Sequence, residues 1–152
     1  MNPDRDKDTI DTEVRRYVYD HLIQRGKPPS AAETAEALRS TLGDVNAAYQ
    51  RLAQGRVLVL QGSGEILMAN PFSAVPTPFL VEAGNRSWWG NCIWDALGIP
   101  AMFRQDARII SGCGDCNDSM VVTVKGGSLS GASGILHFAV PAKHWWDNIV
   151  FT

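Results

Sequence analysis

In the stretch R-S-W-W-G-N-C-I-W-D-A-L-G-I-P, residues 86–100, a predicted strand is followed within a few residues by a predicted helix. Two adjacent tryptophans favour a strand over residues 86–89. Asn91 has a side chain suited to a helix cap, and Gly98 and Pro100 are expected to close a short helix after it. A short helix inserted between strands predicts an α+β fold.

The flanking segments supply the rest of a mostly antiparallel β-sheet. Residues 70–78 form a proline-rich connector that favours extended conformations. A Gly-Asn turn joins residues 79–82, the next predicted strand, to residues 86–89. Further predicted elements are strands over residues 107–111, 120–125 and 135–140, a helical turn over 142–147 and another apolar strand from 148 to 152. We therefore predict a sheet-rich domain over residues 71–152.

The first part of the chain has the pattern of three helices and a hairpin. Apolar residues recur at helical spacing over residues 10–22, and Ser30 begins a capping box for a second helix. Asp44 is expected to cap a third helix, and a Gly-Ser-Gly turn at residues 62–64 joins two short strands. This order of elements predicts a winged helix-turn-helix domain over residues 1–70.

The distribution of charge argues against DNA as the partner of this domain. Residues 1–70 carry nine Lys or Arg and ten Asp or Glu, and the whole chain has a net charge of −2. The predicted third helix has one cation, Arg51, and the hairpin turn at residues 61–65 has none. Because phosphate contacts supply most of the affinity for DNA, we expect a structural or dimerising winged helix, and DNA binding is disfavoured.

The composition is that of a globular protein without a membrane or secretory segment. Of its 152 residues, 45% are hydrophobic and 20% are charged. No apolar run approaches the roughly 18 residues that a membrane span needs. The polar start of the chain has no apolar core of the kind that signal peptides contain. We therefore expect a cytoplasmic protein whose three cysteines stay as thiols.

Cys92 and Asp95 form the pair with the clearest chemical rationale. They are three residues apart at the start of a predicted helix, so they share one face. Free amides and the helix dipole favour the thiolate of Cys92. Burial among Trp88, Trp89 and Trp94 would keep Asp95 protonated as an acid. The same spacing also fits a buried cysteine and an aspartate that binds a nearby backbone amide.

Cys113 and Cys116 form the sequence C-G-D-C, which is half of a typical zinc site. No second CxxC occurs, so a metal clip and a turn with incidental thiols are both compatible with this spacing. His137 or Cys92 would complete a metal site only if folding brought them close. The sequence contains no phosphate-binding glycine loop and no Ser-His-Asp pattern.

Residues 88–102, W-W-G-N-C-I-W-D-A-L-G-I-P-A-M, resemble the organomercurial (alkylmercury) lyase family, in which a Cys and an Asp three residues later lie in a Cys-x-x-Asp-x-Leu setting before Pro-Ala. Residues 107–124 are similar to the strand pair that follows in that family, and residues 137–147 to the approach to its last catalytic segment. The predicted winged helix also matches the family's architecture. The resemblance covers most of the chain and is sharpest at Cys92 and Asp95.

The resemblance implies cleavage of a carbon–mercury bond by protonolysis, a reaction of mercury resistance. A thiolate binds mercury because soft sulfur suits a soft metal, and a carboxyl delivers a proton to the carbon, which leaves as a hydrocarbon. Carried over to this chain, Cys92 is the mercury ligand and Asp95 the proton donor. No organic cofactor is implied, and the mercuric ion leaves to cellular thiols or to a mercuric reductase.

In that family a second thiolate joins the mercury, and residues 150–152 resemble the segment just before it. The resemblance implies that Cys113 is structural, yet the second sulfur in this chain would have to come from Cys116, Cys113 or added thiol. Two further hypotheses stay open. One is a thiol- or metal-sensing regulator that uses the winged helix on DNA and Cys92, Cys113 and Cys116 as ligands, and the other is a homologue that binds metal without turnover.

Overall fold

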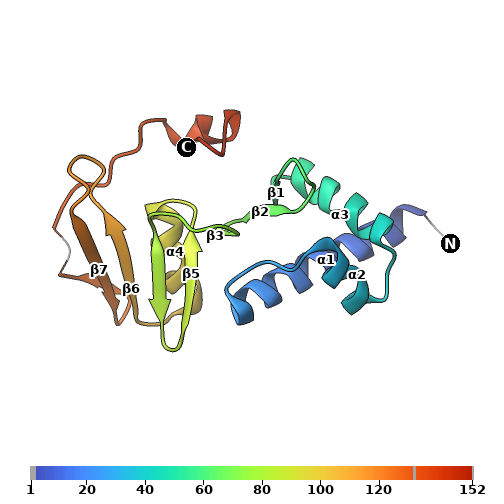
Figure 1. Cartoon of the computed structure of the whole chain (residues 1–152), viewed down its shortest axis with the longest axis horizontal. Coiled ribbons are helices and arrows are strands. Elements are labelled where there is room, and N and C mark those ends of the chain that lie inside the picture. Colours follow the sequence, from blue (N-terminus) through green and yellow to red (C-terminus); the bar gives the residue numbers. More distant parts are fainter. Residues whose placement is uncertain (1–2, 132, 152) are drawn as a thin grey trace.

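In the computed structural model, which describes residues 3–131 and 133–151, helices at one end lead through short strands to a broad sheet at the other (Figure 1). Within those residues eight strands form one sheet in the order β1-β2-β3-β5-β4-β6-β7-β8, and all neighbours are antiparallel. The strands are β1 (Val59–Leu60), β2 (Ile66–Ala69), β3 (Phe72–Ser73), β4 (Leu80–Ala83), β5 (Arg86–Gly90), β6 (Ala107–Gly112), β7 (Ser119–Lys125) and β8 (Ser128–Ser130). The predicted α+β class with a mostly antiparallel sheet is confirmed.

The N-terminal helices are α1 (Pro3–Arg25), α2 (Ala31–Leu38) and α3 (Leu42–Gln54). Their order, followed by the β1–β2 hairpin, is the order expected for a winged helix-turn-helix, and that assignment stays a prediction. No helix among the described residues combines the length and the apolar character that crossing a membrane requires.

The starts of α2 and α3 show how local chemistry sets helix boundaries. The predicted capping box at Ser30 is present: its hydroxyl accepts from the amide of Glu33, whose carboxylate accepts from the amide of Ser30. The predicted cap of α3 at Asp44 is wrong, because Thr41 is the cap and accepts from the amide of Asp44 at 3.1 Å. The Thr41 hydroxyl also donates to the Asp44 carboxylate at 2.7 Å, so both side chains are used at this helix start.

The sheet continues across the predicted boundary at residues 70–71. In the proline-rich connector, β3 pairs with β2 on one side and with β5 on the other. Helix α1 also contacts the sheet, because the buried indole of Trp88 donates to the carbonyl of Leu22 at 3.0 Å. The division into domains 1–70 and 71–152 stays a prediction. The β2–β3 pairing and the Trp88–Leu22 hydrogen bond join the two parts.

Helix α4 (Ile93–Phe103) is longer than the sequence predicted. It passes through Gly98 and Pro100, which were expected to end it, and stops at Arg104, whose φ is +52°. Pro100 lacks an amide hydrogen, but its ring is buried together with Ala96 and Ile99. Burial of this apolar face offsets the missing hydrogen bond.

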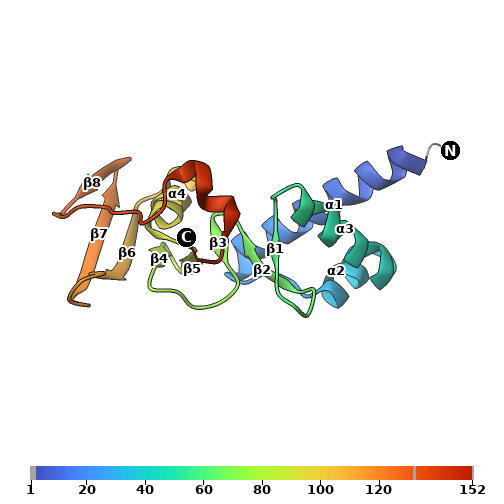
Figure 2. The same cartoon turned by 90° about the horizontal axis from the view of Figure 1, so that it is seen from above.

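The C-terminal segment leaves the sheet instead of extending it. Residues 135–140 form no strand, and residues 149–151 form a turn, so both predicted strands are wrong for the described residues. The predicted helical turn is confirmed as the 3₁₀ helix η1 (Ala142–Asp147). From β8 the segment returns over α4 towards β3 (Figure 2). Most side chains of residues 133–140 are exposed, so no buried face selects a strand register for them.

Gly90 sets the distance between β5 and α4, and its substitution tests that contact. A Cβ atom at Gly90 would lie 2.8 Å from the amide nitrogen and 3.0 Å from the Cα of Ala96. These are backbone atoms, so α4 would have to shift. We expect Gly90→Ala to lower the free energy of unfolding by roughly 1–3 kcal/mol, measured by urea denaturation.

Gly98→Ala is the matched control for this prediction. Gly98 lies within α4 and a Cβ there would meet no atom within 4 Å. The alanine should raise stability by up to about 1 kcal/mol through helix propensity. Equal destabilisation by both substitutions would contradict the role assigned to Gly90.

Candidate active site

Cys92 and Asp95 come from the junction where β5 ends and α4 begins. Cys92 itself is the N-cap residue of α4, and Asp95 lies in the first turn. The prediction that Asn91 caps this helix is wrong, because its amide turns towards Asp95 and Asn70 instead. The chain enters the helix directly from the strand, so both candidate catalytic side chains lie at one end of α4.

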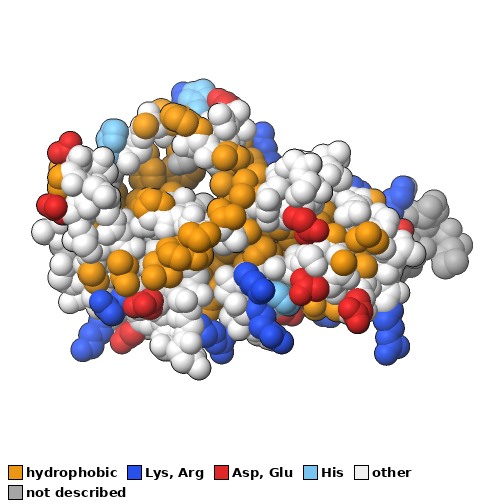
Figure 3. All heavy atoms as spheres, viewed as in Figure 1, with side chains coloured by type: hydrophobic (Ala, Val, Ile, Leu, Met, Phe, Trp, Pro, Cys, Tyr) orange, Lys and Arg blue, Asp and Glu red, His pale blue; other side chains and the backbone are white. Residues whose placement is uncertain are grey.

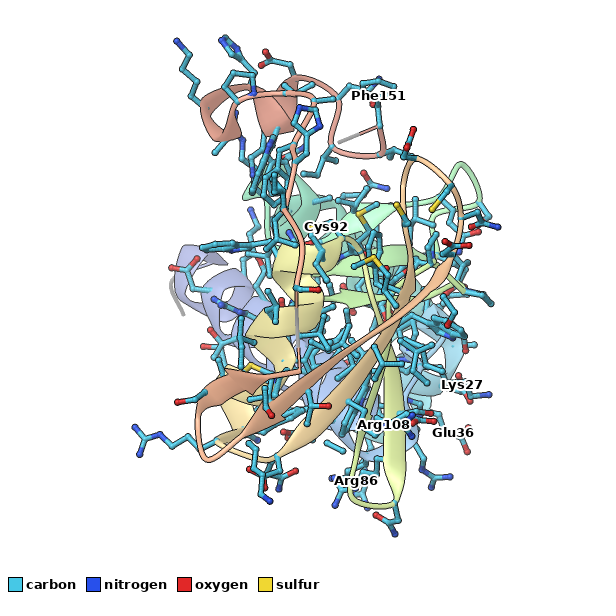
Figure 4. All side chains as sticks on the ribbon, turned by 90° about the vertical axis from the view of Figure 1, so that its left-hand side faces the viewer. Lys27, Glu36, Arg86, Cys92, Arg108 and Phe151 are labelled. Carbon is cyan, nitrogen blue, oxygen red and sulfur yellow. The ribbon has the colours of Figure 1, made fainter. Side chains whose placement is uncertain are left out.

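A cavity of about 470 Å³ is lined by both Cys92 and Asp95. Its other walls are mainly apolar and come from β2, α4 and the C-terminal segment. Figure 3 shows a hollow with hydrophobic side chains beneath the arch of that segment. In Figure 4 Cys92 lies at the end of α4 that faces this segment, on which Phe151 is labelled.

The C-terminal segment forms the roof of the cavity, and two tryptophans of η1, Trp145 and Trp146, make the contacts that position it. The ring of Trp145 packs on Phe138 with centroids 5.3 Å apart, and its indole nitrogen donates to the carbonyl of Val140 at 2.8 Å. The guanidinium of Arg56 lies over the ring of Trp146, 5.5 Å from its centroid. A contact between the end of the helical part and η1 therefore helps to position the roof.

The tryptophans around Asp95 differ from those expected. Trp94 lines the cavity but is 61% exposed. Trp88 is buried against the end of α1, and Trp89 lines a separate groove. The sequence could not supply the tryptophans of η1, because they reach the site only when the C-terminal segment folds back over α4.

The surroundings of the Asp95 carboxyl favour its protonated form. Burial raises its pKa above the ordinary value for an aspartate, and a hydrogen bond from Asn91 lowers it in part. The Asn91 amide nitrogen donates to Asp95 Oδ2 at 3.0 Å. Burial outweighs the hydrogen bond, so the protonated form persists to higher pH than in water.

Hydrogen bonds that the sequence did not predict connect this carboxyl, through Asn91, to Asn70 and Tyr19. The amide nitrogen of Asn91 also donates to Oδ1 of Asn70 at 3.0 Å, and the backbone carbonyl of Asn70 accepts from the hydroxyl of Tyr19 at 3.0 Å. These contacts connect α1 to the site. Among the described side chains, Asn91 Oδ1 is buried without a hydrogen-bond partner. No sequence motif marks this set, because its members are far apart along the chain.

The thiol of Cys92 does not behave as its position at the helix start suggested. Burial raises its pKa, and hydrogen bonds with the backbone of Asp95 and Trp94 lower it by less. The negative charge of Asp95, when ionised, raises it further. The expectation of a favoured thiolate in the free protein is therefore wrong, because desolvation outweighs the helix amides.

Cys113 and Cys116 lie outside this cavity, on the turn between β6 and β7. Among the three cysteines predicted as metal ligands, Cys92 alone lines the cavity. His137 of the C-terminal segment, which was considered as an additional ligand, lines it as well. In the part of the chain that the structure describes, no three His, Cys, Asp or Glu side chains gather in a way that would hold a metal ion. The catalytic and ligand roles of these residues stay predictions.

Comparison with known proteins identifies the family and the fold. The family described as alkylmercury lyase (MerB) matches residues 72–152, which include both candidate catalytic residues. A solved structure, "Crystal structure of the mercury-bound form of MerB2", is similar with a TM-score of 0.61 and 22% identity. The match covers 78% of this chain and 58% of that chain, and at this identity it shows the fold. No curated protein sequence matches the chain significantly.

The raised pKa of Asp95 predicts a pH-dependent effect of Asp95→Asn on stability. In the parent, the unfolded carboxyl releases its proton at a lower pH than the buried carboxyl does, so the free energy of unfolding falls as pH rises from the unfolded pKa through the raised folded pKa. The amide does not ionise, so the variant gains stability relative to the parent across the window above the unfolded pKa of about 3.9. Denaturant unfolding at a series of pH values measures the difference. Asp20→Asn, at an exposed position of α1, is the control, and the same pH dependence in both variants would contradict the prediction.

The three thiols should react with limiting iodoacetamide in an order set by their surroundings. Hydrogen bonds from the backbone of Cys116 and Asp115 lower the pKa of Cys113, whereas burial raises that of Cys92. Because the thiolate is the nucleophile, we expect Cys113 to be labelled several-fold faster than Cys92 at neutral pH. Peptide mass spectrometry measures the order. Predominant labelling of Cys92 would contradict the prediction, because it would show that the helix amides lower the pKa of Cys92 more than burial raises it.

Proposed function

This chain belongs to the alkylmercury lyase family, and we propose that it binds an organomercurial compound through Cys92 and cleaves the carbon–mercury bond with a proton from Asp95. The observation that carries the proposal is the shared cavity, which is lined by a soft ligand, Cys92, and by a carboxyl with a raised pKa, Asp95, both from the start of α4. The activity, the substrate and the partners of the protein are all parts of this proposal.

The first step is exchange of ligands on mercury. The thiol of Cys92 loses its proton, its sulfur forms a bond to mercury, and the previous ligand leaves as an anion. Soft mercury binds thiolate strongly, which lowers the effective pKa of the thiol as the bond forms. A cysteine with a raised pKa in the free protein is therefore compatible with this role.

The second step is protonolysis. The carboxyl of Asp95 delivers its proton to the carbon bound to mercury, and the electron pair of the carbon–mercury bond forms the new carbon–hydrogen bond. A hydrocarbon leaves, mercury stays on sulfur, and Asp95 is left as a carboxylate that accepts from Asn91. A raised pKa favours this role, because a general acid must hold its proton at the working pH.

The apolar lining suits the organic group of the substrate. Phe138, Trp145 and Trp146 line the same cavity as the two reacting side chains. Such walls favour a small alkyl or aryl group over water, and a dry cavity strengthens the electrostatic effects at the carboxyl. The proposed reaction uses no organic cofactor.

The second sulfur of the proposed reaction comes from a thiol in solution. Cys92 is the one cysteine that lines the cavity within the described residues. A small thiol can complete two-coordinate mercury and then carry the mercuric ion to cellular thiols or to a mercuric reductase. The cytoplasmic location and the alternative, a DNA-binding regulator, stay predictions.

The decisive experiment is incubation of the chain with phenylmercury and excess thiol, followed by detection of benzene by gas chromatography. We expect benzene release from the parent, and a loss of 10²-fold or more in Asp95→Asn, because the amide supplies no carboxyl proton. Mercury binding should persist in Asp95→Asn and fall in Cys92→Ser. Asp20→Asn, remote on α1, is the control for charge removal. Turnover of Asp95→Asn at the parent rate would contradict the acid role, and absence of benzene from the parent would contradict the proposed activity.

A further inference from the structure

The turn between β6 and β7 holds a second pair of thiols that the proposed reaction does not use. The turn is closed by two backbone hydrogen bonds, from the amide of Cys113 to the carbonyl of Asp118 at 2.8 Å and from the amide of Asn117 to the carbonyl of Cys113 at 2.9 Å. Within it, the side chains of Cys113 and Cys116 interact, so the two sulfurs are neighbours. This backbone geometry places both thiols together at the surface.

The two thiols differ in the ease with which they lose a proton. Amide groups of Cys116 and Asp115 lower the pKa of Cys113, and the thiol of Cys116 adds to this effect. The amide of Asp118 lowers the pKa of Cys116, but the hydrogen bonds that its thiol makes with Asp118 and Cys113 outweigh it and raise that pKa. The turn therefore presents two neighbouring sulfur ligands, which are the groups that a two-coordinate soft metal ion takes up.

The pair also lies next to the cavity of Cys92. Cys113 lines a groove of about 610 Å³ whose walls include Phe79, Ile93 and His137. The same three residues line the cavity that holds Cys92. The groove that Cys113 lines and the cavity that Cys92 lines therefore share a wall.

We propose that Cys113 and Cys116 form a dithiol site that binds the mercuric ion through both sulfurs, separately from Cys92. Both thiols lose their protons to solvent, the two sulfurs bind mercury as thiolates, and the two previous ligands of mercury leave as anions. The binding itself does not depend on the proposed cleavage. Only the identification of the ion as the product released from Cys92 rests on the proposed function.

The test adds mercuric chloride directly to the reduced full chain, with glutathione as competitor, and measures mercury per chain after equilibrium dialysis. The Cys92→Ser variant should retain one mercury per chain. Cys113→Ser/Cys116→Ser should lose that ion, and Cys116→Ser should bind at least tenfold more weakly, because a second sulfur in the same turn acts at high effective concentration. Circular dichroism checks that the variants fold, and the exposed position of the turn favours this.

Several results would overturn the dithiol site. These are retention of mercury by the double variant at the level of Cys92→Ser, loss of mercury from Cys92→Ser, or mercury-bridged dimers of Cys92→Ser on size-exclusion chromatography. Because no carbon–mercury bond is present, these results leave the proposed cleavage untouched. Equally, a chain that binds mercuric ion at the turn but releases no benzene from phenylmercury would contradict the proposed function alone.

Discussion

The close approach of β5 and α4 at Gly90 determines how the candidate site is built on the sheet. Gly90 leaves room for the backbone of Ala96, so the helix starts directly against the strand that precedes it. This contact fixes where Cys92 and Asp95 lie, and it allows the apolar face of α4 to cover the sheet. The C-terminal segment then closes over the same helix end, which turns an exposed helix start into a cavity.

Features that depend on neighbours in sequence could be predicted, and features that depend on packing could not. The capping box at Ser30 and the spacing of Cys92 and Asp95 follow from local chemistry. The passage of α4 through Pro100 could not be foreseen, because burial against the sheet outweighs the usual effect of proline. The fold class was predictable from local patterns. The path of residues 133–151 was not, because it depends on how this segment packs over α4.

The candidate site also has features that the sequence predicts and features that only the structure shows. The pairing of a thiol with a carboxyl is visible in the sequence, but the balance of forces on each group is not. Cys92 has both helix amides and burial acting on it, and only the structure shows that burial dominates. Asn91 looked like a helix cap, whereas its amide instead holds the carboxyl of Asp95. A polar residue next to a catalytic motif can thus serve the motif and not the helix.

The hydrogen bond from Trp88 to the carbonyl of Leu22 joins residues 66 positions apart. Tyr19 and Asn70 add a second link of this kind, over 51 positions. Closing such long loops costs chain entropy before any contact repays it. We therefore expect the helices to form early, and the end of α4 that carries Cys92 and Asp95 to be completed last, when the sheet docks on α1. Cys92 and Asp95 would then reach their observed arrangement only in molecules in which the sheet has docked correctly on α1. The proposed activity would therefore depend on correct docking.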